Sequence, residues 1–176
     1  IPRGSNAFVR HIMDNTRIPV LGHADGVCHL YIDEAADEAM AIRLAVDSKT
    51  QYVAVCNATE TILIHEKAAD RLLLPLADAL RKAGVTLFGS PEVCARVGCE
   101  LVEDWHTEYL DYKVSLKVVA SLDEAIDHIN TYGSGHTEAV VTADAKTAHE
   151  FRQQVDSGNL FWNCSTRFSD GFRYGF

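Results

Sequence analysis

The fold is decided by residues 61–83, TILIHEKAADRLLLPLADALRKA. The segment Thr61 to His65 is apolar with a period of two, which is typical of a β-strand. The segment Ala68 to Ala83 places three leucines four residues apart in one stripe, as in an amphipathic helix. A strand followed by a helix with one apolar face is the building unit of an α/β layer structure.

The same alternation continues on both sides of this unit. Further strands are predicted at Val27 to Ile32, Val114 to Val119, Thr137 to Thr142 and Asn159 to Asn163. Further helices are predicted at Ala35 to Lys49, Leu122 to Tyr132 and Ala143 to Val155. The pattern therefore indicates an α/β fold along the whole chain.

Several residues mark where helices begin and end. Ser121 and Glu124 form a capping box, and Gly133 stands where a left-handed cap would end the same helix. Ser90, which is followed by a proline, is expected to open a short helix. Pro75 predicts a kink or a restart inside the leucine stripe, because proline removes a backbone donor and clashes with the preceding turn.

Composition restricts the class of protein. The chain has 176 residues, 47% of them hydrophobic, and a net charge of -9, which fits one soluble globular domain. Acidic character disfavours nucleic acid and anionic membranes as partners, and no apolar run approaches the roughly 20 residues of a membrane span. The start, Ile1-Pro2-Arg3-Gly4, is expected to belong to a fragment, since it has neither an initiator methionine nor a signal peptide.

Cysteine and histidine usage argues against disulfides and metals. The five cysteines are an odd number without a C-x-x-C pair, which favours a reducing, cytoplasmic setting over a secreted disulfide framework. The eight histidines are scattered, without the i, i+4 spacing of zinc hydrolases. We therefore expect no metal.

Cys56 is the most informative of the polar residues. It lies in Ala54-Val55-Cys56-Asn57-Ala58, a stretch of small residues between a predicted helix and a strand, where a thiol can be exposed. A nucleophilic cysteine must ionise near neutral pH, which needs backbone donors or a nearby positive charge. By spacing alone, an inert buried thiol is the commoner outcome, and both readings stay open at this point.

Other polar residues are weaker candidates. His29 and His65 lie in apolar strands, where a satisfied core histidine is commoner than a catalytic base. Neither a G-x-G-x-x-G fingerprint nor a P-loop is present to hold a dinucleotide. Arg167 follows a strand end, where a guanidinium can meet an anionic ligand, although by position alone a surface arginine is the commoner reading.

Six blocks of sequence resemble, in order, those of the gamma-glutamyl phosphate reductases, also called glutamate-5-semialdehyde dehydrogenases, a family of the aldehyde dehydrogenase superfamily. The blocks are Ile1-Pro2-Arg3-Gly4-Ser5, Gly22-His23-Ala24-Asp25-Gly26-Val27-Cys28-His29, Val55-Cys56-Asn57-Ala58-Thr59-Glu60-Thr61, Thr107-Glu108-Tyr109-Leu110, Tyr132-Gly133-Ser134-Gly135-His136 and Ser165-Thr166-Arg167-Phe168-Ser169-Asp170-Gly171. The resemblance covers the whole chain and implies a three-layer α/β/α catalytic domain with a mostly parallel sheet.

The resemblance also implies a reaction. In this family a cysteine at the position of Cys56 attacks gamma-glutamyl phosphate, releases phosphate and forms a thioester, which hydride from NADPH reduces to glutamate 5-semialdehyde in proline biosynthesis. Backbone N–H groups around Cys56 and Asn57 are the expected donors to the oxyanion. Glu108 resembles the glutamate that binds the nicotinamide ribose, and Ser165, Thr166 and Arg167 are expected to face the charged end of the substrate.

Hydrolytic members of the superfamily use a glutamate that activates water, and the corresponding region, 21–26, contains none. This agrees with a reductase, because its thioester leaves by hydride transfer. Asp25, the acid of this region, is not expected to serve as that base.

Relatives extend beyond both ends of this sequence, with most of the NADPH-binding domain and a C-terminal segment outside residues 1–176. We therefore expect the isolated chain to fold without turning over, and a homo-oligomer of the full-length enzyme stays open. Two alternatives remain: a non-catalytic α/β binding module of the same fold, and a related acyl or aldehyde dehydrogenase with another substrate.

Overall fold

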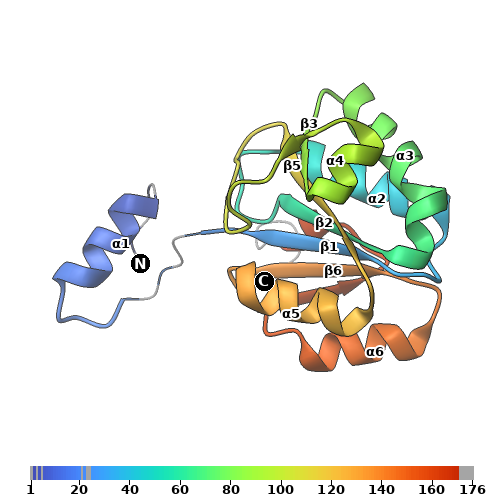
Figure 1. Cartoon of the computed structure of the whole chain (residues 1–176). Helices are drawn as coiled ribbons and strands as arrows, with labels where there is room; N and C mark the ends of the chain where they lie inside the picture. Colours follow the sequence, from blue (N-terminus) through green and yellow to red (C-terminus); the bar gives the residue numbers. More distant parts are fainter. Residues whose placement is uncertain (1, 3, 5, 21, 23–24, 171–176) are drawn as a thin grey trace.

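The structure is a computed structural model that describes residues 2, 4, 6–20, 22 and 25–170 (Figure 1). Strands and helices alternate along most of this length. Their order is α1 (Asn6–Asn15), β1 (Cys28–Ile32), α2 (Glu38–Thr50), β2 (Thr59–His65), α3 (Glu66–Lys82), β3 (Thr86–Gly89), α4 (Pro91–Val97), β4 (Glu100–Leu101), β5 (Lys113–Val119), α5 (Leu122–Tyr132), β6 (Thr137–Val141), α6 (Ala145–Gln154), β7 (Asn159–Trp162) and the 3₁₀ helix η1 (Thr166–Phe168).

In the described part of the chain, seven strands form one sheet in the order β4-β3-β5-β2-β1-β6-β7. Each neighbouring pair is parallel, so the amino ends of all strands lie along the same edge. The most central neighbours are β5, β2 and β1. The segments that precede these three strands therefore meet at the middle of the amino edge.

Helices cover both faces of this sheet (Figure 1). One core joins it to α2, α3 and α4, and a second, smaller core joins its other face to α5 and α6. Alternate residues of β2 divide between the two, since Ile62 and Ile64 belong to the larger core and Leu63 to the smaller one. The predicted three-layer α/β/α fold with a mostly parallel sheet is confirmed, and both faces are buried as such sheets require.

Four elements are absent from the sequence-based prediction: α1, β3, β4 and η1. The two strands are short, and Thr86–Gly89 contains only two buried residues, which is too little for a periodic signal. The two serine caps are confirmed, because Ser90 opens α4 and Ser121 opens α5 by accepting a hydrogen bond from a main-chain N–H. None of the helices in the described residues is both long enough and apolar enough to cross a bilayer.

Of the kink or restart predicted at Pro75, the restart is wrong. Helix α3 runs through this residue from Glu66 to Lys82. Three leucines of the stripe, Leu72, Leu76 and Leu80, are fully buried against the sheet. Their packing holds the helix together across the lost hydrogen bond, since most helical stability in proteins comes from the buried face.

The predicted left-handed cap at Gly133 is also wrong. Its φ and ψ are -72° and 162°, which is extended backbone, while its N–H still bonds to the carbonyl of Ile129. Glycine is needed for space: a Cβ would lie 2.6 Å from that carbonyl oxygen and 3.1 Å from a carboxylate oxygen of Glu138.

The leucine stripe gives a matched test of the larger core. Leu72→Ala should lower the free energy of unfolding by about 2–5 kcal/mol, because it removes a fully buried side chain and leaves a cavity. Leu74→Ala, on the exposed side of the same helix, should change it by no more than about 0.5 kcal/mol. Urea unfolding followed by circular dichroism measures the free energy of unfolding of both variants. Equal losses of stability would contradict the assignment of Leu72 to the buried face of α3.

Candidate active site

Cys56 lies in a turn between α2 and β2, at the amino edge of the sheet. The N–H of Ala58 donates to the carbonyl of Val55 at 3.1 Å, so Cys56 and Asn57 occupy the two central positions of the turn. The Cys56 side chain is half-buried, whereas Asn57 is almost fully buried. The predicted setting, a thiol at the end of an element, is therefore what the structure shows.

Gly26, just before β1, packs against the backbone of Cys56. A Cβ at this position would lie 2.2 Å from the Cys56 carbonyl oxygen and 2.5 Å from its Cα, closer than two such atoms can approach. The N–H of Gly26 donates to Oε1 of Glu108 at 2.9 Å. Gly26 thus connects the cysteine turn to Glu108, 82 residues further along the chain.

The segment that carries Glu108 is fixed by its neighbour Tyr109. The ring of Tyr109 stacks on Phe88 of β3, with centroids 5.3 Å apart, and its hydroxyl lies 2.8 Å from the hydroxyl of Ser115 on β5. Leu110 follows with a φ of 50°, a left-handed conformation that bends the chain toward β5. Two strands therefore set the position of the carboxylate beside Gly26.

A buried ion pair lies at the base of the cysteine turn. Nζ of Lys49, at the end of α2, is 2.6 Å from Oε2 of Glu60 on β2, and both side chains are fully buried. Burial raises the pKa of Glu60 to about 7, while Lys49 and the nearby amides of Leu110 and Tyr109 favour its charged form. Burial also lowers the pKa of Lys49, an effect that Glu60 opposes.

The segment 165–169 docks against the same turn. The side-chain amide of Asn57 donates to the carbonyl of Ser169, and the hydroxyls of Thr59 and Thr166 are 3.2 Å apart. Asn57, just before β2, and Thr59, the first residue of β2, are thereby brought together with this distant segment. Cys56, Asn57, Glu108 and the segment around Thr166 all belong to one region of the molecule.

Ser165 and Thr166 are buried within this region. The Ser165 hydroxyl accepts a hydrogen bond from Ser48 at 3.1 Å, and the N–H of Thr166 donates to the Ser48 hydroxyl at 3.3 Å. Arg167 is 9% exposed, and its Nε has no hydrogen-bond partner within the described residues. The predicted contact of these three residues with substrate stays a prediction.

Cys28 contributes to the site in a way that its sequence position did not indicate. Its thiol donates to the Cys56 carbonyl at 3.1 Å, and its pKa is raised by burial and by the charge of Glu138. Gly26, Cys28 and Glu60 lie within blocks that carry the family resemblance, which was the available signal. Lys49 carried no such signal, because its role depends on a contact that only the fold creates.

The two strand histidines make contacts within the fold, although Nε2 of His29 has no hydrogen-bond partner within the described residues. His65 caps α3 by accepting from the N–H of Lys67 at 3.1 Å. His29 is fully buried, with Nδ1 3.1 Å from a carboxylate oxygen of Glu138, and burial lowers its pKa to about 3. Burial likewise raises the pKa of Glu138, and the ring of His128 packs edge-on against His29.

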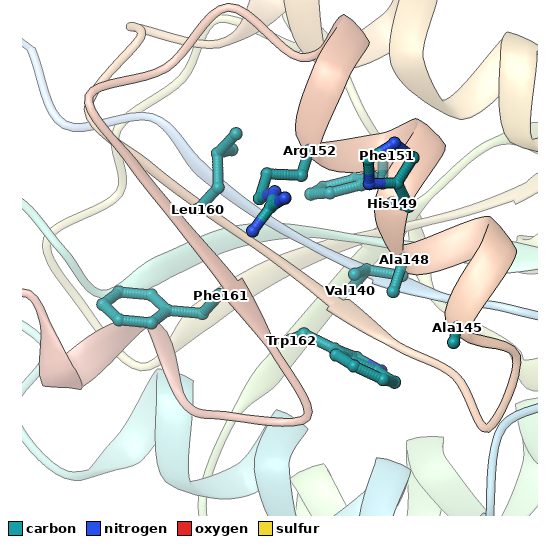
Figure 2. Close-up of a pocket in the computed structure, with 9 residues that line it drawn as sticks. All are labelled: Val140, Ala145, Ala148, His149, Phe151, Arg152, Leu160, Phe161 and Trp162. Carbon is teal, nitrogen blue, oxygen red and sulfur yellow. The ribbon is translucent and has the colours of Figure 1, made fainter.

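A surface cavity of about 280 Å³ lies elsewhere, between α6 and the edge strand β7 (Figure 2). Its lining includes Arg152 and His149 of α6 and Trp162 of β7, and none of the predicted site residues. The described residues contain no group of three or more His, Cys, Asp or Glu side chains that could hold a metal ion. The candidate site is the region around Cys56, where the hydrogen bonds of Gly26 and Asn57 bring distant segments together.

Comparison with known proteins indicates the family of the chain. Residues 114–175 match the model of the Aldehyde dehydrogenase family. The whole chain is 64% identical to gamma-glutamyl phosphate reductases of Pelotomaculum thermopropionicum and Acetivibrio thermocellus. The chain spans about two fifths of the length of these curated relatives, 41% in both cases.

Solved structures show the same relationship. The crystal structure of gamma-glutamyl phosphate reductase from Thermotoga maritima matches 99% of this chain with a TM-score of 0.95 and 39% identity, over 43% of its own chain. An acetylating aldehyde dehydrogenase from Geobacillus thermoglucosidasius matches 96% of this chain and 46% of its own, with a TM-score of 0.70 and 19% identity. The second match supports the fold alone.

The close contact at Gly26 is testable. Gly26→Ala should lower the free energy of unfolding by about 1–3 kcal/mol, because the new methyl group must displace the Cys56 backbone. Gly158→Ala is the matched control, since a Cβ there would be no closer than 3.5 Å to its neighbours. Urea unfolding of both variants measures the difference, and an unaffected Gly26→Ala would contradict the described packing.

The histidine cluster predicts acid sensitivity. Burial lowers the pKa of His128 to about 3, so the folded chain binds its proton less readily than the unfolded chain, and stability is lost as pH falls from about 6.5 toward 3. His128→Phe should therefore reduce the stability lost between about pH 7 and pH 5 by up to about 2 kcal/mol. Urea midpoints at the two pH values measure this, and an unchanged pH dependence would contradict a buried neutral His128.

Proposed function

Because the chain belongs to the gamma-glutamyl phosphate reductase family, we propose that it carries the nucleophile for reducing gamma-glutamyl phosphate to glutamate 5-semialdehyde, an oxidoreductase step of proline biosynthesis. The observation that carries this proposal is the half-buried Cys56 in a turn at the sheet edge. Gly26 packs against the Cys56 backbone and donates its N–H to Glu108, so Cys56 and Glu108 both contact the same glycine.

In the proposed first step, the Cys56 thiol loses its proton to solvent water and the sulfur attacks the acyl carbon of the substrate. A C–S bond forms, the bond from the acyl carbon to the phosphate oxygen breaks, and phosphate leaves with that electron pair. The product is a thioester on Cys56. NADPH, when bound, would supply a hydride to the thioester carbon. The C–S bond of the resulting tetrahedral species then breaks, which forms the aldehyde and restores the Cys56 thiolate.

The attack of the Cys56 sulfur and the addition of hydride each place negative charge on the oxygen of the acyl carbon. We assign the backbone N–H groups of Cys56 and Asn57 to stabilise this oxyanion, an arrangement typically worth about 3 kcal/mol per donor. The turn supports the assignment, because its closing bond from the amide of Ala58 to the carbonyl of Val55 fixes Cys56 and Asn57 at its two central positions. The buried Asn57 side chain, bound to Ser169, holds the turn in place.

Glu108 is proposed to hold the nicotinamide ribose of NADPH. One of its carboxylate oxygens accepts the Gly26 N–H at 2.9 Å. A carboxylate offers about four acceptor positions, so this bond is compatible with accepting ribose hydroxyls as well. The half-buried side chain is thus oriented by the protein and chemically suited to the cofactor.

The charged end of the substrate is assigned to the segment with Ser165, Thr166 and Arg167. Arg167 supplies the cation, and its buried Nε has no hydrogen-bond partner within the described residues, which suits an anionic ligand. Ser165 and Thr166 hold the segment through their bonds to Ser48 and Thr59. Asp25 pairs with Arg10, so its carboxylate has a structural partner and is not proposed as a water-activating base.

The nucleophile is tested first on the chain itself. At neutral pH, Cys56 should be alkylated by iodoacetamide at least about tenfold faster than Cys164, whose pKa burial raises. Peptide mass spectrometry of the folded chain over time gives the rate at each cysteine, and an unfolded sample shows the rates without structure. Equal rates at the two residues in the folded chain would favour a non-catalytic module.

Turnover is tested in a chimera in which this chain replaces the matching segment of the Pelotomaculum relative. The chimera should oxidise NADPH and release phosphate when given gamma-glutamyl phosphate, and Cys56→Ser should lower kcat at least about a thousandfold. Cys164→Ser is the matched control and should retain activity. Substantial activity in the Cys56→Ser chimera would contradict the assignment.

A further inference from the structure

Two cysteines far from the candidate active site lie against each other. Cys94 of α4 and Cys99, just before β4, have their Sγ atoms 2.7 Å apart, inside the contact distance of two sulfur atoms that are not bonded. Both side chains are half-buried, so a small reagent can reach them. Their spacing of five residues gave no disulfide or metal signal in the sequence.

The turn between the two cysteines is built to bring them together. Gly98 ends α4 in the left-handed region, with a φ of 66°, and its N–H donates to the Cys94 carbonyl at 2.8 Å. The guanidinium of Arg81 holds the outer side of this turn by donating to the carbonyls of Val97 and Gly98, at 2.5 and 3.1 Å. The reversal of the chain is thereby fixed from both sides.

The space that the thiols occupy depends on a glycine of β3. A Cβ at Gly89 would lie 3.0 Å from the Cys99 sulfur and 2.9 Å from a methyl group of Val93. The Cys94 thiol also lies 3.1 Å from the carbonyl of Glu100. The strand, the helix and the turn therefore confine both sulfur atoms to one small site.

We propose that Cys94 and Cys99 are a redox modification site that closes to an intramolecular disulfide when the chain meets a disulfide oxidant such as oxidised glutathione. The sulfur atoms need to approach by only about 0.7 Å to reach the bonded separation of about 2.05 Å. Such a shift lies within the reach of side-chain rotation, so the fold does not have to open. The site is separate from the proposed nucleophile Cys56.

The reaction occurs in two thiol exchanges. The Cys94 thiolate attacks one sulfur of oxidised glutathione, and one glutathione thiolate leaves. The Cys99 sulfur then gives up its proton and attacks the Cys94 sulfur, which releases the second glutathione. The protein loses two electrons and two protons, and one glutathione disulfide is reduced to two thiols.

The surroundings assign the order of these exchanges. Burial and the adjacent Cys94 thiol raise the pKa of Cys99 to about 12, while Arg81 partly opposes this effect. Cys99 is therefore a poor first nucleophile at neutral pH. As a second nucleophile it is favoured by position, because its sulfur lies against the bond that it must attack.

The site is tested by incubating the folded chain with mixtures of reduced and oxidised glutathione. Free thiols are then blocked with N-ethylmaleimide and the chain is digested with trypsin. Arg96 lies between the two cysteines, so the disulfide would join two separate tryptic peptides, residues 83–96 and 97–113. We expect this linked pair to accumulate as the oxidised fraction rises, with a mass lower by two hydrogens and reversal by dithiothreitol.

Three substitutions complete the test. Cys94→Ser and Cys99→Ser should each abolish the linked pair, whereas Cys164→Ser should retain it. Cys99→Ser should trap a glutathione adduct on Cys94, at about tenfold higher yield than Cys94→Ser traps on Cys99. The proposal is overturned if the wild-type chain carries separate blocking groups on both cysteines at every glutathione ratio, or if either one links mainly to another cysteine.

Discussion

Lys49 and Glu60 form a fully buried ion pair at the two ends of the segment that contains Cys56. Lys49 lies in the last turn of α2 and Glu60 lies on β2. Their contact therefore joins the two ends of the intervening segment. Breaking such a pair by removing one partner typically costs about 3–5 kcal/mol, because a buried charge is left alone. The position of Cys56 thus depends on an interaction that keeps both ends of its turn inside the protein. The pairing of β1 with β2 also shifts register beside Glu60, between Cys28 and His29.

The parallel sheet brings the segment between Lys49 and Glu60 together with the other segments of the candidate site. Because all strands run the same way and β5, β2 and β1 are adjacent, the segments before them meet at one edge. Glu108 precedes β5, Cys56 precedes β2 and Gly26 precedes β1, so residues far apart in sequence become neighbours. Because Gly26 has no side chain, its backbone can approach the backbone of Cys56. The N–H of Gly26 orients the carboxylate of Glu108.

Much of this architecture is encoded in patterns that a single sequence displays. The period-two strand at 61–65 and the leucine stripe that follows it predict a strand and a helix, and both are confirmed in β2 and α3. Tertiary packing explains the exceptions: buried leucines carry α3 through Pro75, and steric room at Gly133 matters more than left-handed geometry. Strand order could not be predicted, since it depends on long-range pairing that no local pattern records.

The five cysteines show why residue type alone could not define the site. Cys28 is buried and its thiol donates to a carbonyl, whereas Cys56 is half-buried in a turn. The sulfur atoms of Cys94 and Cys99 lie in contact with each other at the end of a helix. A thiol reacts according to its charge, its access and its neighbours, and each of these is set by the fold. The family resemblance could single out Cys56, because a motif surrounds it. The contact between Cys94 and Cys99 arises from one left-handed glycine and one arginine of a different helix, so only the three-dimensional structure could reveal it.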